Sequence, residues 1–247
     1  MGTPAGSNVV LTPVADPADP RLAPFRRLSD AAFRRRVETS SAFGGGIVVL
    51  EGWLALERGL RTRHRLKAVL VDRAKAARAL DLLAGGAGTD PVTVFTAPTA
   101  LIDEVVGFAL HRGVVAVADR GRDPLWSSIA RRARTSLLVH GVGDAENMGM
   151  LIRNAAAFDV GAVLVDPTCT PPLSRRSIRV SVGYALTVPL ATVRTAMATR
   201  ALVDLGIPVY ALSPAMVRTV RSRTVPPPRQ AVRASTRSFP TCRGGRL

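Results

Sequence analysis

Cysteine and lysine are scarce in this chain of 247 residues, and long apolar runs are absent. The two cysteines, Cys169 and Cys242, form no CxxC pair and lie beside no histidine cluster, which argues against a metal site and a disulfide framework. No run of about 18 apolar residues occurs, so no membrane span is expected. Residues 1–16 lack the charged start and apolar stretch of a signal peptide. These absences predict a soluble, cytoplasmic protein without a bound metal.

Positive charge is abundant, with 34 lysines and arginines against 18 acidic residues and a formal net charge of +16. Only Lys67 and Lys75 are lysines, and residues 216–247 carry eight arginines and no acid. Arginine forks match phosphate geometry, although GC-rich coding also produces an arginine bias. The charge therefore favours a nucleic acid as partner, with an acidic membrane surface as the second choice.

The first half of the chain alternates between strand-like and helix-like patterns, which predicts an α/β domain over residues 26–122. Residues 1–25, rich in proline, alanine and aspartate, are interpreted as a lead-in segment, and residues 26–36 as a basic helix. The predicted strands are 47–50, 66–71, 92–95 and 114–118, and the predicted helices between them are 53–60, 75–83 and 101–109.

Residues 123–135 are interpreted as a linker with a short helix, after which the alternation resumes over residues 136–215. The predicted strands are 136–140, 162–165 and 208–212, and the predicted helices are 148–158 and 191–205. Successive strand–helix units of this kind indicate a parallel sheet. After Pro214 the pattern stops, so residues 216–247 are expected to form a basic tail without regular structure.

The segment 139–158 is the most informative, because it runs from a strand through a polar loop into a helix. Open α/β sheets bind ligands at such strand ends, and a helix N-terminus offers free N–H groups to an anion. Periodicity alone favours a solvated side chain for Arg153, a helix cap for Asn147 and an interior histidine for His140. One face of the helix is predicted to hold Leu151, Ala155 and Phe158, with Arg153 roughly opposite.

A family resemblance goes further than this anion site. The pattern Asn147-x-Gly149-x-x-x-Arg153-x-Ala155 resembles the first motif of the SpoU/TrmH RNA 2′-O-methyltransferases, members of the SPOUT superfamily. Residues 172–183, which end in Arg-x-Ser-x-Gly, are similar to a later stretch of that family. The front half looks like the substrate-binding domain that these enzymes often carry, on the segments Asp19–Leu22, Glu51-Gly52 and His111–Val114.

The resemblance implies an N-terminal α/β RNA-binding domain, similar to a small ribosomal protein, followed by a parallel-sheet methyltransferase domain of the trefoil-knot type. It implies methyl transfer from S-adenosylmethionine to a ribose 2′-hydroxyl of ribosomal or transfer RNA, by a homodimer. Arg153 would act at the hydroxyl, and Asn147 would shape the loop that meets RNA. The resemblance assigns RNA contacts to Arg175, Arg176 and Arg179, cofactor contacts to Leu212 and Ser213, and a supporting role to Ser181.

The chain departs from the family near its end. A Gly-x-Glu-x-x-Gly turn and a Ser-Leu-Asn-Val helix start, which build most of the cofactor pocket, are not found, and residues 216–247 stand where they would begin. A truncated or frame-shifted end is therefore expected, with an incomplete methyltransferase domain, weak cofactor binding and poor solubility. His140 stands where the family often has an acid, and Asp159 where it often has glycine.

Two other functions remain open on the sequence. A non-catalytic RNA-binding protein derived from the same family would account for the missing cofactor motifs and the basic tail. A nucleotide-binding α/β enzyme of another class would need a glycine-rich fingerprint. Gly44–Gly46 lacks the Lys-Ser/Thr of a P-loop and does not lie between a strand and a helix, which disfavours that class.

Overall fold

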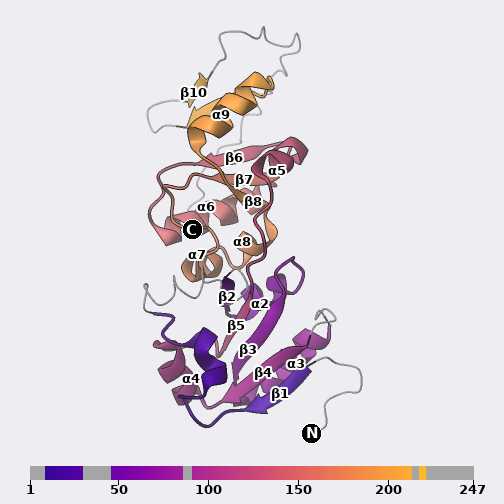
Figure 1. Cartoon of the computed structure of the whole chain (residues 1–247), viewed down its shortest axis with the longest axis vertical. Helices are drawn as coiled ribbons and strands as arrows, with labels where there is room; N and C mark the ends of the chain where they lie inside the picture. The colour runs from indigo at the N-terminus through magenta and orange to yellow at the C-terminus, as the bar shows by residue number, and fades with distance from the viewer. Residues whose placement is uncertain (1–8, 30–45, 86–90, 213–216, 221–247) are drawn as a thin grey trace, which may run out of the picture. The chain divides into compact units, whose positions relative to one another are not determined.

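The computed structural model describes residues 9–29, 46–85, 91–212 and 217–220, and it has an α/β fold (Figure 1). The chain separates into two compact units, the first formed by residues 1–195 and the second by residues 196–247. The predicted linker 123–135 lies inside the first unit, and the division into domains over 26–122 and 136–215 stays a prediction.

A five-stranded mixed sheet forms the first half of the first unit, in the order β1-β4-β3-β5-β2. Strands β1, β4 and β3 are parallel, whereas β5 runs antiparallel to both β3 and β2. In spatial order the strands are β1 (Val9–Pro13), β4 (Val92–Ala97), β3 (Leu66–Asp72), β5 (Val114–Asp119) and β2 (Ile47–Glu51). The helical segments are η1 (Pro20–Phe25), α2 (Trp53–Gly59), η3 (Arg73–Lys75), α3 (Ala76–Ala84) and α4 (Thr99–Val106).

All four strands and all three helices predicted between residues 47 and 118 are present, with small shifts at their ends. The interpretation of residues 1–25 as a lead-in segment missed strand β1, which pairs in register from Val9↔Val92 to Pro13↔Thr96. Val10 and Leu11 are exposed on this edge strand, so the alternation that marks a half-buried strand is weak there. The helix predicted over 26–36 begins as turns at Arg26–Ser29, and its remainder lies outside the described residues.

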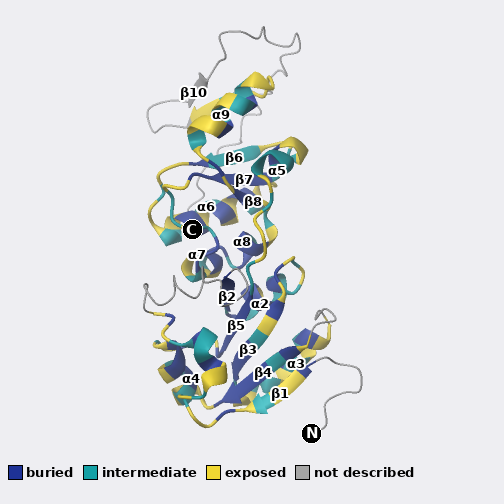
Figure 2. Cartoon of the chain, in the orientation of Figure 1, coloured by how far each residue is buried: buried dark blue, intermediate teal, exposed yellow. Residues whose placement is uncertain are grey.

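Away from the edge strand β1, side chains on both faces of the five-stranded sheet are largely buried, which explains why β2, β4 and β5 are mostly apolar runs. Along β2, Val48 and Leu50 belong to one core cluster while Ile47 and Val49 belong to the other, as the period of two requires. Figure 2 shows buried residues concentrated along the strands. The cluster that contains Leu50 continues into residues 139–190, so the two halves of the first unit share one core.

A three-stranded parallel sheet, in the order β6-β7-β8, forms the second half of the first unit. This confirms the predicted parallel arrangement for β6 and β7. The strands are β6 (Ser136–Val139), β7 (Ala162–Val165) and β8 (Leu190–Thr192). The helices are α5 (Trp126–Arg132), α6 (Ala145–Ala157), α7 (Arg175–Val180) and α8 (Tyr184–Thr187).

The prediction of a helix over residues 191–205 was wrong at its start. Leu190–Thr192 is the strand β8, paired with β7, and helix α9 covers Thr195–Asp204. A strand of three residues is too short to show a periodic pattern, so the apolar residues on both sides of Thr192 looked like one helix.

The second unit contains most of α9 and a two-stranded antiparallel sheet of β9 (Val209–Leu212) and β10 (Val217–Val220). Residues 208–212 were predicted to extend the parallel sheet, but among the described strands β9 pairs only with β10, from Val209↔Val220 to Leu212↔Val217. β10 lies in the segment predicted to lack regular structure. Among the described helices, none combines the length and the apolar character that crossing a bilayer requires.

Candidate active site at the ends of the parallel strands

Helix α6 begins at a polar loop that follows β6, and Asp144 is its N-cap. The Asp144 carboxylate accepts hydrogen bonds from the backbone N–H groups of Glu146 (3.0 Å) and Asn147 (2.8 Å). This corrects the interpretation of Asn147 as the cap, because Asn147 lies three residues further along. Its side chain is exposed and makes no hydrogen bond to any other described residue. The amide of Asn147 therefore remains available for a ligand.

Gly149 lies where α6 contacts α7. A Cβ atom at position 149 would stand 2.7 Å from Cβ of Val180 and 2.9 Å from the carbonyl oxygen of Ser177. The hydroxyl of Ser177 donates to the carbonyl of Ala145 at 3.1 Å and so joins the same two helices. The glycine of the Asn-x-Gly motif thus permits the close approach of α7 to α6.

Arg153 projects from the exposed side of α6. Met148 and Ile152 are fully buried on the opposite side. Within the described residues Arg153 forms no ion pair or hydrogen bond, so its guanidinium can meet a ligand. Of the residues predicted to share one face of the helix, Ala155 is buried, whereas Phe158 is 82% exposed at the C-cap.

Helix α7 carries the three arginines predicted to contact RNA, and each has an acidic partner in the protein. Arg176 pairs with Glu146 at 2.6 Å on the surface. Arg175 pairs with Glu51 at the end of β2, and its guanidinium lies 4.4 Å from the centre of the Phe108 ring. Arg179 lies 3.8 Å from the same Glu51 carboxylate.

The side chains of Glu51 and Arg175 are only 11% and 14% exposed, whereas that of Arg179 is 42% exposed. Arg175 therefore joins α7 to the five-stranded sheet, while Arg176 and Arg179 keep exposed surface. The structural role of Glu51 was not visible in the sequence, because its partner Arg175 lies 124 positions away.

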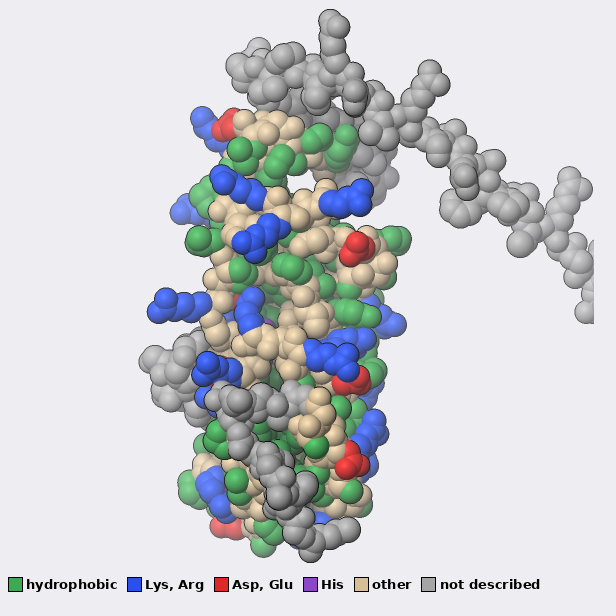
Figure 3. Space-filling view, turned by 90° about the vertical axis from the view of Figure 1, so that its right-hand side faces the viewer, with side chains coloured by type: hydrophobic (Ala, Val, Ile, Leu, Met, Phe, Trp, Pro, Cys, Tyr) green, Lys and Arg blue, Asp and Glu red, His purple; other side chains and the backbone are tan. Residues whose placement is uncertain are grey.

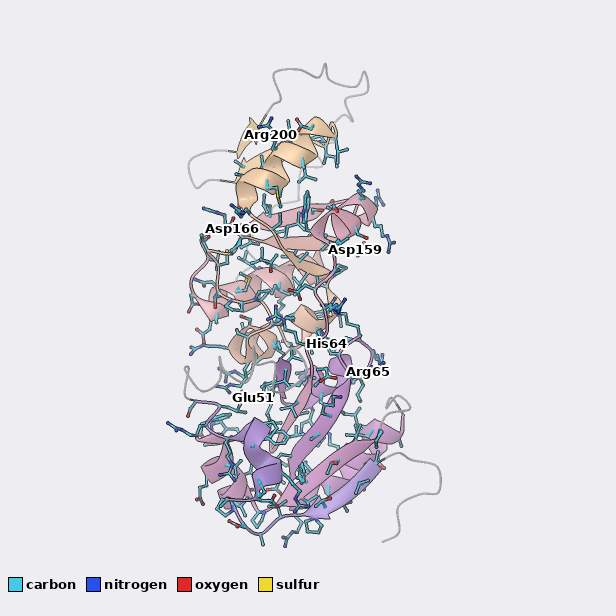
Figure 4. The ribbon with its side chains drawn as sticks, viewed as in Figure 1. Glu51, His64, Arg65, Asp159, Asp166 and Arg200 are labelled. Atoms are coloured by element: carbon cyan, nitrogen blue, oxygen red, sulfur yellow. The ribbon has the colours of Figure 1, made fainter. Side chains whose placement is uncertain are left out.

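A second set of polar residues, at the ends of β7 and β8, was not singled out as a site from the sequence. Asp166 follows β7 and is buried; in Figure 4 it is labelled at the end of that strand remote from Asp159. Its carboxylate accepts from the backbone N–H of Thr195 at 2.6 Å and from the Thr195 hydroxyl at 2.8 Å. It also accepts from the N–H and hydroxyl of Thr168, at 3.0 and 2.7 Å.

These hydrogen bonds, those from the Thr195 and Thr168 N–H groups first, hold the pKa of Asp166 well below its ordinary value. Asp166 is therefore a permanently charged anchor at neutral pH. The ring of His140, exposed at the end of β6, lies with Nδ1 3.1 Å from the hydroxyl of Thr195 and 3.5 Å from Asp166. The carboxyl ends of all three parallel strands thus meet in one polar network.

The loop between β6 and α6 is fixed against the loop after β7. The backbone N–H of Thr170 donates to the carbonyl of Val142 at 2.8 Å, and the Val142 N–H donates to Sγ of the free cysteine Cys169 at 3.4 Å. Gly141 and Gly143 face open space, with no atom within 4 Å of where a Cβ would lie. This leaves an accessible backbone beside the N-terminus of α6.

The two predicted cofactor contacts stay a prediction. Leu212 is the last residue of β9 in the second unit, and Ser213 lies outside the described residues. Asn147 and Arg153 both belong to α6 in the first unit.

The fold and site define an α/β protein with a polar ligand site at the carboxyl ends of parallel strands, beside a helix N-terminus and an arginine without a partner among the described residues. Residues 134–232 match the model of the SpoU rRNA Methylase family. This part of the chain is therefore similar to SpoU methylases. The match includes residues 216–232, the first part of the segment that the sequence pattern separates as a tail.

Curated relatives carry methyltransferase names. A Mycobacterium tuberculosis protein named "uncharacterized tRNA/rRNA methyltransferase" is 38% identical over 178 residues, which cover 72% of this chain and 59% of the relative. The 23S rRNA (guanosine-2′-O-)-methyltransferase RlmB of Vibrio cholerae is 37% identical over 114 residues, 44% of this chain and 46% of that enzyme. The chain thus spans about three-fifths of the length of the Mycobacterium relative.

Solved structures of the same fold come from two further bacteria. An rRNA methyltransferase from Sinorhizobium meliloti, solved with AdoMet bound, matches with a TM-score of 0.61 at 16% identity and covers 81% of this chain and 70% of its own. The SpoU methyltransferase AviRb from Streptomyces viridochromogenes matches with a TM-score of 0.56 at 20% identity, covering 75% of this chain and 65% of its own. At these identities the likeness concerns the fold.

Proposed function

We propose that this protein transfers a methyl group from S-adenosylmethionine to a ribose 2′-hydroxyl of ribosomal or transfer RNA. The observation that carries the proposal is Arg153, placed by the SpoU motif on the exposed side of α6 and left without a partner among the described residues. The names of the relatives support RNA methylation, and RlmB is named as a 2′-O enzyme.

The described residues fit the cofactor at the strand ends, where the backbone at Gly141 and Gly143 is open and the Thr195 hydroxyl is fixed by Asp166. When bound, S-adenosylmethionine supplies an electrophilic methyl group on a sulfonium. The family resemblance assigns further cofactor contacts to Leu212 and Ser213.

The reaction requires a ribose oxygen to attack the methyl carbon in line, to break the carbon–sulfur bond and to lose its proton. A guanidinium at Arg153 would bind the adjacent phosphate or the attacking oxygen, orienting it and lowering the cost of its developing negative charge. Asn147, six residues earlier on the same helix, would hold the nucleotide in place. Arg176 and Arg179, which keep exposed surface, would contact the phosphate backbone.

The resemblance also supports two coarser proposals about organisation. Residues 26–122 would act as the RNA-binding domain, similar to a small ribosomal protein. The protein would function as a homodimer, a state that light scattering coupled to gel filtration would measure directly.

Calorimetric titration with S-adenosylmethionine, and with S-adenosylhomocysteine as second ligand, tests the cofactor assignment. Methyl transfer to total RNA then tests the reaction, and resistance of the product to alkaline hydrolysis distinguishes ribose from base methylation. Arg153→Ala should retain cofactor binding and lower the transfer rate by about 100-fold, because a transition-state contact is lost. The control Arg200→Ala removes an exposed arginine of α9 and should leave the rate unchanged.

Two outcomes would overturn the proposal. Equal rates for Arg153→Ala and the wild type would remove Arg153 from the reaction. Absence of cofactor binding, with RNA binding retained, would favour the alternative of a non-catalytic RNA-binding protein.

A further inference from the structure

A cluster of cations lies at the start of β3. This is the end of the five-stranded sheet opposite to the one where Asp72 and Gly113 lie. Residues 61–67 and 119–123 together hold six cationic and two acidic side chains. We call the six the basic ridge: Arg61, Arg63, Arg65, Lys67, Arg120 and Arg122. Five of them are exposed and Arg120 is half-buried. Figure 3 shows one face of the molecule, on which Lys and Arg side chains outnumber Asp and Glu.

The fold brings the two segments of the ridge together. β3 pairs antiparallel with β5, and the backbone N–H of Asp119 donates to the carbonyl of Arg65 at 2.8 Å. The register shifts between Leu66 and Ala68, which makes Lys67 the extra residue of a bulge. Bulges turn a side chain out of the regular ladder and often occur beside functional surfaces. Exposed and buried positions alternate here, so the cations share one side of the chain.

A buried histidine, His64, connects the two segments of the basic ridge. His64 is 4% exposed, and its Nδ1 lies 3.2 Å from the carbonyl of Asp119; Figure 4 shows His64 and Arg65 together at the start of β3. Burial, above all, lowers the pKa of His64, so the ring is neutral at physiological pH. The hydroxyl of Thr62 donates to the carbonyl of Gly59 at 2.8 Å. The backbone that carries these cations is therefore ordered before RNA binds, which reduces the conformational entropy that the protein loses on binding.

Carboxylates orient the ridge without neutralising it. Asp123 lies between Arg120 (3.1 Å) and Arg63 (3.9 Å), and Asp119 pairs with Lys67 at 2.9 Å. Arg61 pairs with the half-buried Glu57 at 3.8 Å. In these ion pairs of the described residues, three carboxylates face four of the six cations, and exposed pairs of this kind contribute little stability. A phosphate can replace a carboxylate at such pairs at small cost.

We propose that the basic ridge binds the phosphate backbone of the RNA substrate, at a surface separate from the α6 and α7 residues of the candidate active site. This inference rests on the proposed function for the identity of the RNA. Arginine forks bind phosphate oxygens in pairs, and contacts to phosphates position an RNA without reading its sequence. The ridge would then anchor RNA while the nucleotide to be modified reaches Arg153.

The experiment compares charge-removal variants in binding to a short random-sequence RNA duplex. The ridge variants are Arg61→Gln/Arg63→Gln and Lys67→Gln/Arg122→Gln. The matched control, Arg73→Gln/Arg200→Gln, removes two cations at exposed positions elsewhere. Each ridge variant should weaken binding by about tenfold at low salt and lower the slope of log affinity against log salt by about 1.5. The control should stay within about twofold of the wild type.

A variant with the opposite sign separates electrostatics from damage to the fold. Asp123→Asn removes the carboxylate between Arg63 and Arg120 and should raise RNA affinity by about threefold, with a steeper salt dependence. A melting curve of Asp123→Asn that matches the wild type would show that the change in affinity does not come from loss of structure. Equal effects of ridge and control variants, or lower affinity of Asp123→Asn, would overturn the proposal.

The binding assay contains no S-adenosylmethionine, so its result is independent of catalysis. If the ridge variants lose RNA affinity while the wild type transfers no methyl group, the result supports RNA binding by the basic ridge and contradicts the proposed reaction. If the wild type methylates RNA but the ridge variants bind the duplex as well as it does, the reaction stands and the ridge is refuted. A wild-type chain that binds no RNA duplex at low salt would also refute the ridge.

Discussion

At the scale of single residues, Asp166 shows how a buried charge is made stable. Its carboxylate is buried and receives four hydrogen bonds from Thr168 and Thr195, so the ionised form has the partners that water would otherwise supply. The lowered pKa of Asp166 follows from those donors. The same hydrogen bonds fix Thr195, whose hydroxyl lies within hydrogen-bond distance of Nδ1 of His140.

The lowered pKa predicts an acid-dependent loss of stability. Because the pKa of Asp166 is lower in the folded than in the unfolded protein, its ionised carboxylate stabilises the fold. This stabilisation is complete at pH values above the ordinary carboxyl pKa of about 3.9 and is lost as the pH falls below it. Asp166→Asn cannot accept all four hydrogen bonds and should melt below the wild type at pH 7. Melting temperatures across the acid range should show the gap closing below about pH 4. A gap independent of pH would contradict this role, and Asp204→Asn, at an exposed site, serves as control.

Asp159 stands where the family often has glycine, and its backbone conformation is one that favours glycine. Its φ of 52° lies in the left-handed region, which favours glycine and tolerates aspartate better than most residues. The family often has glycine at this position, and the structure supplies the physical reason. The following N–H of Val160 donates to the carbonyl of Ala155 and so closes helix α6.

At the scale of elements, the contact of α6 with α7 depends on the missing side chain of Gly149. Alanine within a helix normally stabilises it by about 1 kcal/mol relative to glycine. Here the added Cβ would meet Val180 and the Ser177 carbonyl below 3.0 Å, so Gly149→Ala should lower the free energy of unfolding by about 2 kcal/mol. Denaturant titration measures the change.

The control for this prediction is Gly143→Ala in the loop before α6, where a new Cβ has no atom within 4 Å. Its effect on stability should be small. If Gly149→Ala stabilised the protein as an ordinary helical glycine replacement does, α7 would not be packed against α6 as described.

The attachment of α7 to β2 depends on the charge of Glu51. Replacing Glu51 by glutamine leaves the largely buried Arg175 without its anionic partner and should cost about 2 kcal/mol, measured by denaturant titration. Glu146→Gln is the matched control, because the pair of Glu146 with Arg176 is about half exposed on both sides. That change should cost no more than about 0.5 kcal/mol. Equal effects would show that Glu51 is not a structural anchor.

At the scale of the whole molecule, the first unit is held by a core cluster that runs from the five-stranded sheet into helices α6 to α8. Ile152 of α6 and Val69 of β3, both fully buried, belong to that one cluster. Arg58 of α2 also donates to the carbonyl of Val182 and lies over the ring of Tyr184 at 4.0 Å. The two sheets of the unit are therefore expected to unfold together.

This continuity can be measured by native-state hydrogen exchange. Ile152→Ala should lower the free energy of unfolding by about 3 kcal/mol and should speed exchange of the slowest β3 amides by the same free energy. Met150→Ala, at an exposed position on the same helix, is the control and should leave β3 unchanged. Faster exchange confined to α6–α8 would show that the two halves open separately.

By itself, the sequence determined most of the local structure and the centre of the candidate site. Apolar periodicity predicted the strands from 47 to 118 and the parallel strands β6 and β7, and the Asn147–Arg153 spacing indicated the SpoU family. These features depend on neighbours within a few residues, which a single sequence displays.

Only the tertiary structure decided which segments meet. Strand β1 is an exposed edge strand, and strand β8 has only three residues. Each of them forms because a partner strand lies beside it. The pairing of Glu51 with Arg175 and of Asp166 with Thr195 joins residues 124 and 29 positions apart, and the basic ridge joins residues 61–67 to 119–123. Such contacts depend on where the chain returns in space, which no local pattern specifies.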